Sequence, residues 1–359
     1  MTMTAQFQQI APVTHILPLT GLRRARLLPV NGRVLVRASQ EVTPTDIIAE
    51  GDLNPRHLLV PIGHLIKTAR RGQARKMIER KVNEKVQEGD ILVSTRGLFK
   101  QVVRAPAGGV ILQITANHIL IEAPGQPFQL LAGMSGQVAE IIPDRGAILE
   151  ANGTLIQGVW GNGLVGAGML LIKIQSPDDE LTSSMLNMNM RGEVTFGGYV
   201  RDEKVLKYAA EVSMGGLILG SMHADLAPLA KRLKLPVILL EGFGHIPVNQ
   251  AAFKLLTTNE KRDVAVNAID WKPLSGDRPE VIISLPVKGE IGPETDVFRP
   301  GLTVRIITPP YAGRIGKVIG VLNEQVRLPS GVRTNAAIVE IENGEGEVTI
   351  PLANMDVIE

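Results

Sequence analysis

The sequence predicts a multidomain, mainly β protein with one small α/β domain, and three observations support this. The 359 residues exceed one ordinary domain of about 100–200 residues. Through the first 175 and the last 90 residues, short β-branched segments alternate with Gly, Pro and Asp turns. Between them, residues 191–269 combine continuous apolar runs with helical spacings of three and four. The 44% hydrophobic content excludes a disordered chain.

Residues 1–175 are predicted to form a β-rich region. Segments such as Gly32–Arg37, Asp90–Ser94 and Gly109–Thr115 alternate apolar and polar residues, and the turn signals recur at the spacing typical of sandwiches and barrels. One short helix is expected within His57–Lys81. The polar stretch Ser176–Met190 is predicted to be a linker to the next domain.

A motif in this region resembles barrel-sandwich hybrid folds. Glu88–Leu92 (EGDIL), followed by Ala105–Pro106 and Gly109–Val110, is similar to their V-x-x-GD-x-L and AP-x-x-G-x-V signature. That family includes the biotinyl and lipoyl carrier domains. Lys100 lies nine residues before Gly109, where the lipoyl pattern needs eleven, and no Met-Lys-Met occurs. The resemblance therefore implies an unmodified β module, and no cofactor is expected.

Residues 191–269 are predicted to form a small Rossmann-like α/β domain. The predicted strands are Glu193–Val200, Gly216–Gly220, Pro236–Leu240 and Asp263–Asn267, and the predicted helices are Asp202–Val212, Ala224–Leu233 and Val248–Thr257. Continuous apolar strands are typical of buried parallel sheets, and alternation with helices implies right-handed crossovers.

Ligands of parallel sheets bind beyond the carboxyl ends of the strands. The candidate ligand-binding residues at these ends are Gly220, Ser221, His223, Glu241, Gly242, Gly244 and His245. Glycine amides suit an anion, and the His and Glu side chains suit acid–base work or weak metal binding. The alternative is structural, with Ser221 or Asp225 as a helix cap and the glycines at positive φ.

No recognised catalytic or metal motif accompanies these residues. The G-x-G-x-x-G at Gly161–Gly166 runs into an apolar stretch and a Pro turn rather than a helix, so it is predicted to be a β-turn and not a dinucleotide site. We therefore assign no catalytic residue and no metal ligand, and an enzyme is the less favoured interpretation.

Residues 270–359 are predicted to be β again. Segments Leu302–Ile307, Pro309–Val321, Ala337–Glu342 and Glu347–Leu352 resemble a KOW module, the small five-stranded barrel of certain ribosomal proteins and transcription-elongation factors. The turn residues of the resemblance are Gly313, Arg314, Gly316 and Lys317. Since this region has 9 Lys/Arg against 13 Asp/Glu, it favours a protein contact over RNA.

The net charge of +2 conceals a basic first third, because residues 1–104 hold 17 Lys/Arg against 8 Asp/Glu. Most of the excess lies in residues 67–81, and the candidate partner-binding residues there are Lys67, Arg70, Arg71, Arg75, Lys76, Arg80 and Lys81. Such a cluster can neutralise phosphates, although a solvated face or a surface packed on an acidic domain is the alternative. No aromatic residue lies between Phe7 and Phe99, which excludes base stacking from this segment.

The leading hypothesis is a non-catalytic binding or assembly protein. Its basic region and KOW-like barrel would contact nucleic acid or a ribosome- or transcription-type complex. The alternatives are a small-ligand or anion-binding protein or enzyme with its site at the strand ends of residues 191–269, and a self-assembling structural protein. The absence of Cys, of a targeting signal and of any apolar span predicts a cytoplasmic protein without membrane contact.

Overall fold

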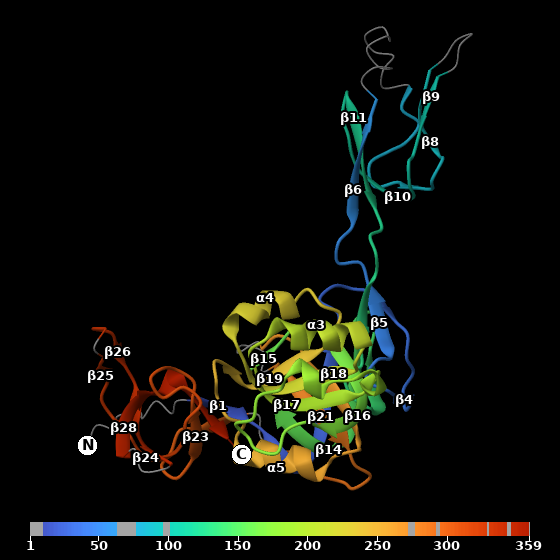
Figure 1. Cartoon of the computed structure of the whole chain (residues 1–359). Coiled ribbons are helices and arrows are strands. Elements are labelled where there is room, and N and C mark those ends of the chain that lie inside the picture. Colours follow the sequence, from blue (N-terminus) through green and yellow to red (C-terminus); the bar gives the residue numbers. More distant parts are fainter. Residues whose placement is uncertain are drawn as a thin grey trace.

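The computed structural model describes residues 10–62, 77–95, 101–271, 277–291, 295–328, 330–342 and 346–358. The described chain is mainly β, and its strands form several separate sheets. Figure 1 shows a central sheet covered by helices, a slender β unit that rises from it, and a C-terminal β unit beside it. We call the sheet and its helices the body.

The central sheet has 11 strands. In sheet order they are β15 (Trp160–Gly161), β19 (Val237–Phe243), β18 (Gly216–Met222), β17 (Val194–Val200), β16 (Val165–Ile172), β20 (Asp263–Asn267), β21 (Glu280–Ser284), β14 (Gly146–Gln157), β13 (Gly136–Ile142) and β4 (Glu41–Val42), with β2 (Ile16–Leu27) paired to β14. The sheet therefore runs without a break through strands from the regions before and after residues 191–269.

The strands predicted for residues 191–269 are present, but the sheet is mixed rather than parallel. Strands β16 to β19 are parallel, whereas β15 runs antiparallel to β19 and β20 antiparallel to β16. The prediction of a purely parallel sheet fails because apolar periodicity identifies a buried strand without giving its direction. Gly161–Gly166 is followed by β16 and not by a helix, as expected.

Three α-helices cover the two faces of this part of the sheet, namely α3 (Glu203–Val212), α4 (Ala227–Ala230) and α5 (Gln250–Thr258). Helices α3 and α4 pack in one apolar core, and α5 packs in another on the opposite face. The α3 helix is capped by Asp202, whose carboxylate accepts the N–H of Lys204 at 2.9 Å. The α4 helix is shorter than predicted, because a 3₁₀ turn, η3 (Ala224–Leu226), occupies its start.

The predicted linker, residues 176–190, packs against the sheet. It contains two 3₁₀ turns, η1 (Ser183–Met185) and η2 (Met188–Met190), and Leu181, Leu186 and Met190 are buried in the core that α3 closes. The polar composition concealed this packing because the few apolar residues face inward.

The described residues between 56 and 123 form the unit that rises from the body (Figure 1), which we call the projecting unit. Its strands are β6 (Arg56–Pro61), β7 (Lys85–Val86), β8 (Ile91–Ser94), β9 (Val102–Arg104), β10 (Gly109–Ile114) and β11 (His118–Ala123). They form a four-stranded sheet and a separate hairpin around their own core, which includes Leu92, Ile111 and Ile121. The helix expected within His57–Lys81 falls mainly outside the described residues, and His57–Pro61 belongs to β6.

The projecting unit is inserted between two strands of a small sheet at the edge of the body. That sheet consists of β3 (Arg33–Val34), β5 (Ile47–Gly51) and β12 (Phe128–Leu131), in the order β12-β5-β3. The chain leaves the body after β5 and returns to it at β12.

The C-terminal unit is built on a seven-stranded sheet. In sheet order its strands are β22 (Thr295–Val297), β1 (Ile10–Thr14), β29 (Met355–Ile358), β23 (Thr303–Ile306), β24 (Ile315–Val321), β27 (Ala336–Ile341) and β28 (Gly346–Pro351), and β25 (Val326–Arg327) pairs separately with β26 (Arg333–Thr334). Strand β1 comes from the region predicted to be the first domain, and its Val13 is buried in the C-terminal core. A pairing this distant in sequence leaves no local signal.

Candidate functional site

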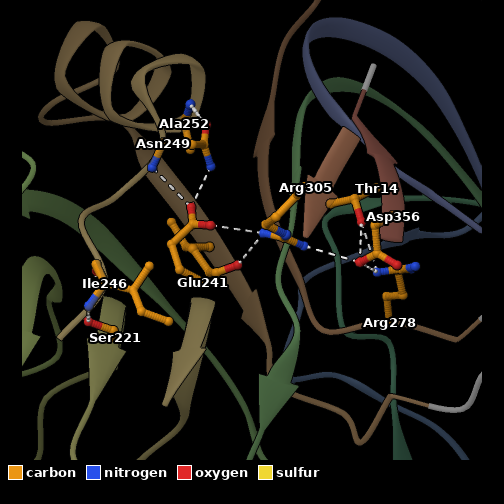
Figure 2. Close-up of polar contacts among 10 residues, drawn as sticks. Thr14, Ser221, Glu241, Ile246, Asn249, Ala252, Arg278, Arg305 and Asp356 are labelled. Carbon is orange, nitrogen blue, oxygen red and sulfur yellow. Dashed lines mark hydrogen bonds and ion pairs between the residues drawn. The ribbon is translucent and has the colours of Figure 1, made fainter. Parts of the chain in front are cut away.

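The predicted residues at the end of β18 have structural contacts. The fully buried Ser221 donates its hydroxyl to the Ile246 carbonyl at 2.8 Å and accepts the Ile246 N–H at 3.1 Å (Figure 2). A Cβ at Gly220 would come within 2.4 Å of Val248 Cγ2. Both residues therefore hold the loop after β19 against β18.

The carboxylate of Glu241, in β19, also makes structural contacts within the protein. Its side chain is 1% exposed, and Oε1 accepts the N–H of Asn249 at 3.0 Å and its Nδ2 at 2.5 Å. Asn249 in turn caps α5 by accepting the Ala252 N–H at 2.8 Å. Glu241 Oε2 faces Arg305 Nη1 at 3.0 Å (Figure 2). The carboxylate thus fixes the start of α5 and binds an arginine of the C-terminal unit.

Arg305 lies in β23 and is 1% exposed. Its Nη1 also donates to the Leu240 carbonyl at 2.8 Å, and its Nη2 lies 3.4 Å from Asp356 Oδ2. Burial opposes the charge of the guanidinium, but the carboxylates of Glu241 and Asp356 together outweigh it and raise the pKa of Arg305. Arg305 is therefore held in its charged form.

Asp356, in β29, extends the contacts to Thr14 in β1 and to Arg278, which precedes β21. Its Oδ2 accepts the hydroxyl of Thr14 at 3.3 Å and lies 3.4 Å from Arg278 Nη1. The Arg278 guanidinium stacks over the Trp271 ring, 4.6 Å from its centroid. Burial lowers the pKa of Arg278, against the opposing effect of Asp356. We call Thr14, Glu241, Arg278, Arg305 and Asp356 the joint cluster (Figure 2).

The joint cluster carries two arginines and two carboxylates, so its formal charges balance. Because the cluster occupies Glu241, this carboxylate is not free to bind an exogenous ligand. The sequence analysis missed Arg305, Arg278 and Asp356. The signal that could have found Arg305 is a lone charged residue within the apolar run Leu302–Ile307.

The two candidate histidines make separate contacts. His245 Nε2 lies 3.1 Å from Asp178 Oδ1, and its ring stacks on Tyr199 with 4.5 Å between centroids. His223 Nδ1 lies 3.6 Å from Asp225 Oδ2. Gly242, near the end of β19, and Gly244, just after it, have φ of +119° and +107°, a conformation that favours glycine. The contacts therefore do not unite the candidate residues in one site.

A crevice of about 630 Å³ lies beyond the carboxyl ends of β17 and β18. Its polar lining residues are Glu180, Arg201, Asp202, Glu203, His223 and Asp225. Of the predicted ligand residues only His223 lines it, and carboxylates outnumber cations, which disfavours an anion. Among the described residues, no group of three or more His, Cys, Asp or Glu is placed to hold a metal ion.

Five of the seven candidate residues of the basic segment, Lys67, Arg70, Arg71, Arg75 and Lys76, lie outside the described residues. Of the other two, Arg80 is structural. It lies 2.8 Å from Glu84 and 3.3 Å from Asp90, and its Nε donates to the Ile91 carbonyl. The Arg80 side chain and the Lys81 N–H lower the pKa of Glu84. The side chain of Lys81 is exposed.

The candidate turn of the C-terminal unit contacts the body. Gly313 has φ +81°, and a Cβ there would lie 2.3 Å from Ile246 Cγ2 in the loop after β19. A Cβ at Gly316 would lie 2.6 Å from Val339 Cγ1 inside the C-terminal unit. Arg314 and Lys317 are exposed. The glycines thus permit close packing and leave the two cations at the surface.

No known protein-family model matches the chain, and no curated protein sequence matches it. Within the described ranges, no helix is both long and apolar enough to cross a bilayer.

Proposed function

We propose that this chain is a non-catalytic binding or assembly protein that acts in the cytoplasm. Its projecting unit and KOW-like C-terminal barrel contact nucleic acid or a ribosome- or transcription-type complex. The observation that supports this most directly is the excess of Lys and Arg in the sequence of residues 56–123, the stretch whose described residues form the unit that rises from the body (Figure 1).

The charge of this stretch of sequence differs in sign from that of the remainder. Residues 56–123 hold 12 Lys/Arg against 5 Asp/Glu, a net charge of +7, so the other residues together carry −5. A cationic stretch of chain attracts a polyanion, which the remaining residues, net acidic, repel. The described residues of this stretch hold 5 Lys/Arg against 5 Asp/Glu, so the excess lies in residues 63–76 and 96–100, outside the described residues. Each phosphate neutralised also releases counterions, which favours binding at low salt.

The carboxylates of the projecting unit are largely engaged within it. Glu84 and Asp90 pair with Arg80, and Glu122 lies 3.5 Å from His57. By contrast, four exposed cations form no ion pair with any described residue. They are Arg56, Lys81, Lys85 and Arg104. The guanidinium of Arg104 donates to the Gly89 carbonyl at 2.7 Å, so of the four only Arg56, Lys81 and Lys85 are available to phosphates.

The test is binding of the full chain to a fluorescent RNA and a DNA duplex at several salt concentrations. We expect the native chain to bind at about 50 mM salt and the reversal of Arg70, Arg71, Arg75 and Lys76 to Glu to weaken binding at least about tenfold. The matched control reverses four exposed cations of the body, Arg191, Lys254, Lys261 and Arg262. Equal loss in both variants, or no binding by the native chain, contradicts the proposal.

A second candidate function is binding of a small ligand in the crevice beyond β17 and β18. Its volume suits a small molecule, and its excess of carboxylates favours a cationic one. With spermidine as the probe, this candidate expects a rise in melting temperature that His223→Ala reduces. No shift with the native chain would exclude spermidine-like ligands.

A further inference from the structure

The covalent connection between the projecting unit and the body consists of two short linkers, Asp52–Pro55 and Pro124–Pro127. Strand pairing in the body ends where Gly51 faces Phe128, and it resumes in the unit where Arg56 faces Ala123. Three of the eight linker residues are proline, which has no N–H to donate and cannot continue a strand ladder.

In place of strand pairing, the side chain of Asp52 joins the two linkers. Asp52 Oδ2 accepts the N–H of Gly125 in the other linker at 2.8 Å, and Oδ1 accepts the N–H of Asn54 at 3.1 Å. The linkers are also in close contact, since a Cβ at Gly125 would lie 2.2 Å from the Asn54 carbonyl oxygen. Both linkers are fully described, and no other hydrogen bond joins them.

Among the described residues, neither strand pairing nor a shared core joins the unit to the body. Its sheets are separate from those of the body, and its core residues all belong to residues 58–121. A compact element on two unpaired linkers turns as a rigid body unless the linkers are fastened to each other.

We propose that the Asp52–Gly125 contact is a clasp that fixes the direction in which the projecting unit stands and so orients its exposed cations Arg56, Lys81 and Lys85 toward the partner. The aiming role depends on the proposed function, whereas the clasp itself is a property of the free chain. Asp52 is a positioning residue in this scheme and touches no partner.

The experiment measures the distance distribution between two spin labels in the full chain. Because the chain has no Cys, Glu88→Cys on the unit and Glu211→Cys on α3 give unique labelling sites, and both positions are exposed. Asp52→Ala removes the carboxylate that accepts the Gly125 N–H. Gly125→Ala keeps that N–H but adds a Cβ that collides with the Asn54 carbonyl oxygen and so pushes the linkers apart. We expect a narrow distribution in the native chain and a width increased about twofold or more in both variants.

The matched control is Asp46→Ala, which removes an exposed carboxylate that accepts the Thr43 N–H at 2.7 Å inside the body. It should keep the native width. The clasp is refuted by unchanged widths in both linker variants, or by a native width as broad as theirs. If the widths change as expected but the native chain binds no nucleic acid, the clasp stands and the proposed function fails.

Discussion

The C-terminal unit and the projecting unit join the same body in opposite ways. At the C-terminal unit, a buried cluster of two arginines and two carboxylates spans the contact, and the Gly313 turn packs on Ile246. At the projecting unit, an exposed aspartate accepts one N–H between two linkers. Both joints use a carboxylate as acceptor, but the C-terminal joint is buried and pairs charged groups, whereas the projecting joint is exposed and has one backbone donor.

Burial determines how much such a contact contributes to the free energy of unfolding. A buried charge that loses its partner has no water to replace it, whereas an exposed carboxylate exchanges its partner for solvent at little cost. The C-terminal joint should therefore govern stability, and the projecting joint should govern only orientation. The predictions below test this contrast.

The largest effect is expected for Arg305→Ala. It leaves Glu241 and Asp356 buried without their cation, and it should cost about 3–5 kcal/mol in the free energy of unfolding. Urea denaturation followed by far-UV circular dichroism measures the change. Arg327→Ala, at an exposed position of the same unit, should stay within about 0.5 kcal/mol. A loss below about 1 kcal/mol for Arg305→Ala would show that the joint cluster does not hold the units together.

A smaller loss of stability is expected when the pH is lowered. Burial raises the pKa of Glu280, but Arg24, 2.7 Å away, and Gln157 outweigh it, so the pKa is lowered overall. A lowered pKa gives stability that is complete above the ordinary value of 4.5 and is lost as pH falls through the folded value. Melting curves from pH 7 downward should therefore show a decline below about pH 4.5 that is shallower in Glu280→Gln. Parallel profiles in both proteins would assign the decline to other groups.

Removal of the projecting unit should hardly affect the body. Replacing residues 56–123 by two glycines deletes a complete core and severs no strand pairing with the body. The melting temperature of the remainder should change by less than about 2 °C, while nucleic-acid binding is lost. Calorimetry checks the first point, and a drop of about 10 °C would reveal contacts that stabilise the body.

The smallest effect on stability is expected for Asp52→Ala, because its carboxylate is exposed. The free energy of unfolding should change by less than about 0.5 kcal/mol, even though the spin-label distribution broadens. A loss of about 2 kcal/mol would mean that the clasp resembles the buried joint and that the contrast between the two is wrong.

The sequence predicted local structure well and long-range structure poorly. Strand Asp263–Asn267 has the predicted bounds, and α3 begins one residue after the predicted start because Asp202 is its cap. Periodicity and capping are local signals, which one segment carries by itself. The mixed direction of the sheet and the inclusion of β1 in the C-terminal unit depend on partners far along the chain.

The candidate site shows the same limit. From the sequence, Glu241 was predicted to act as an acid–base group or weak metal ligand at a strand end. Its main charged partner, Arg305, lies 64 residues later in another unit. The sequence marks both residues as charges within apolar runs, yet nothing in it pairs them. The charge of residues 56–123 was readable from composition, whereas the position of the projecting unit away from the body was not.

The pairing of β1 with β29 also constrains the order of events during synthesis. Thr14 and Asp356, which form a hydrogen bond, are separated by 342 residues. At about 5–20 residues per second, roughly 20–70 s pass between the synthesis of the first strand and that of the partner that completes its sheet. The projecting unit, whose strand pairings span at most 67 residues, can close long before then. Until β29 leaves the ribosome, β1 has unpaired backbone groups on the edge that β29 covers, so a chaperone that shields nascent chains would act most usefully on β1.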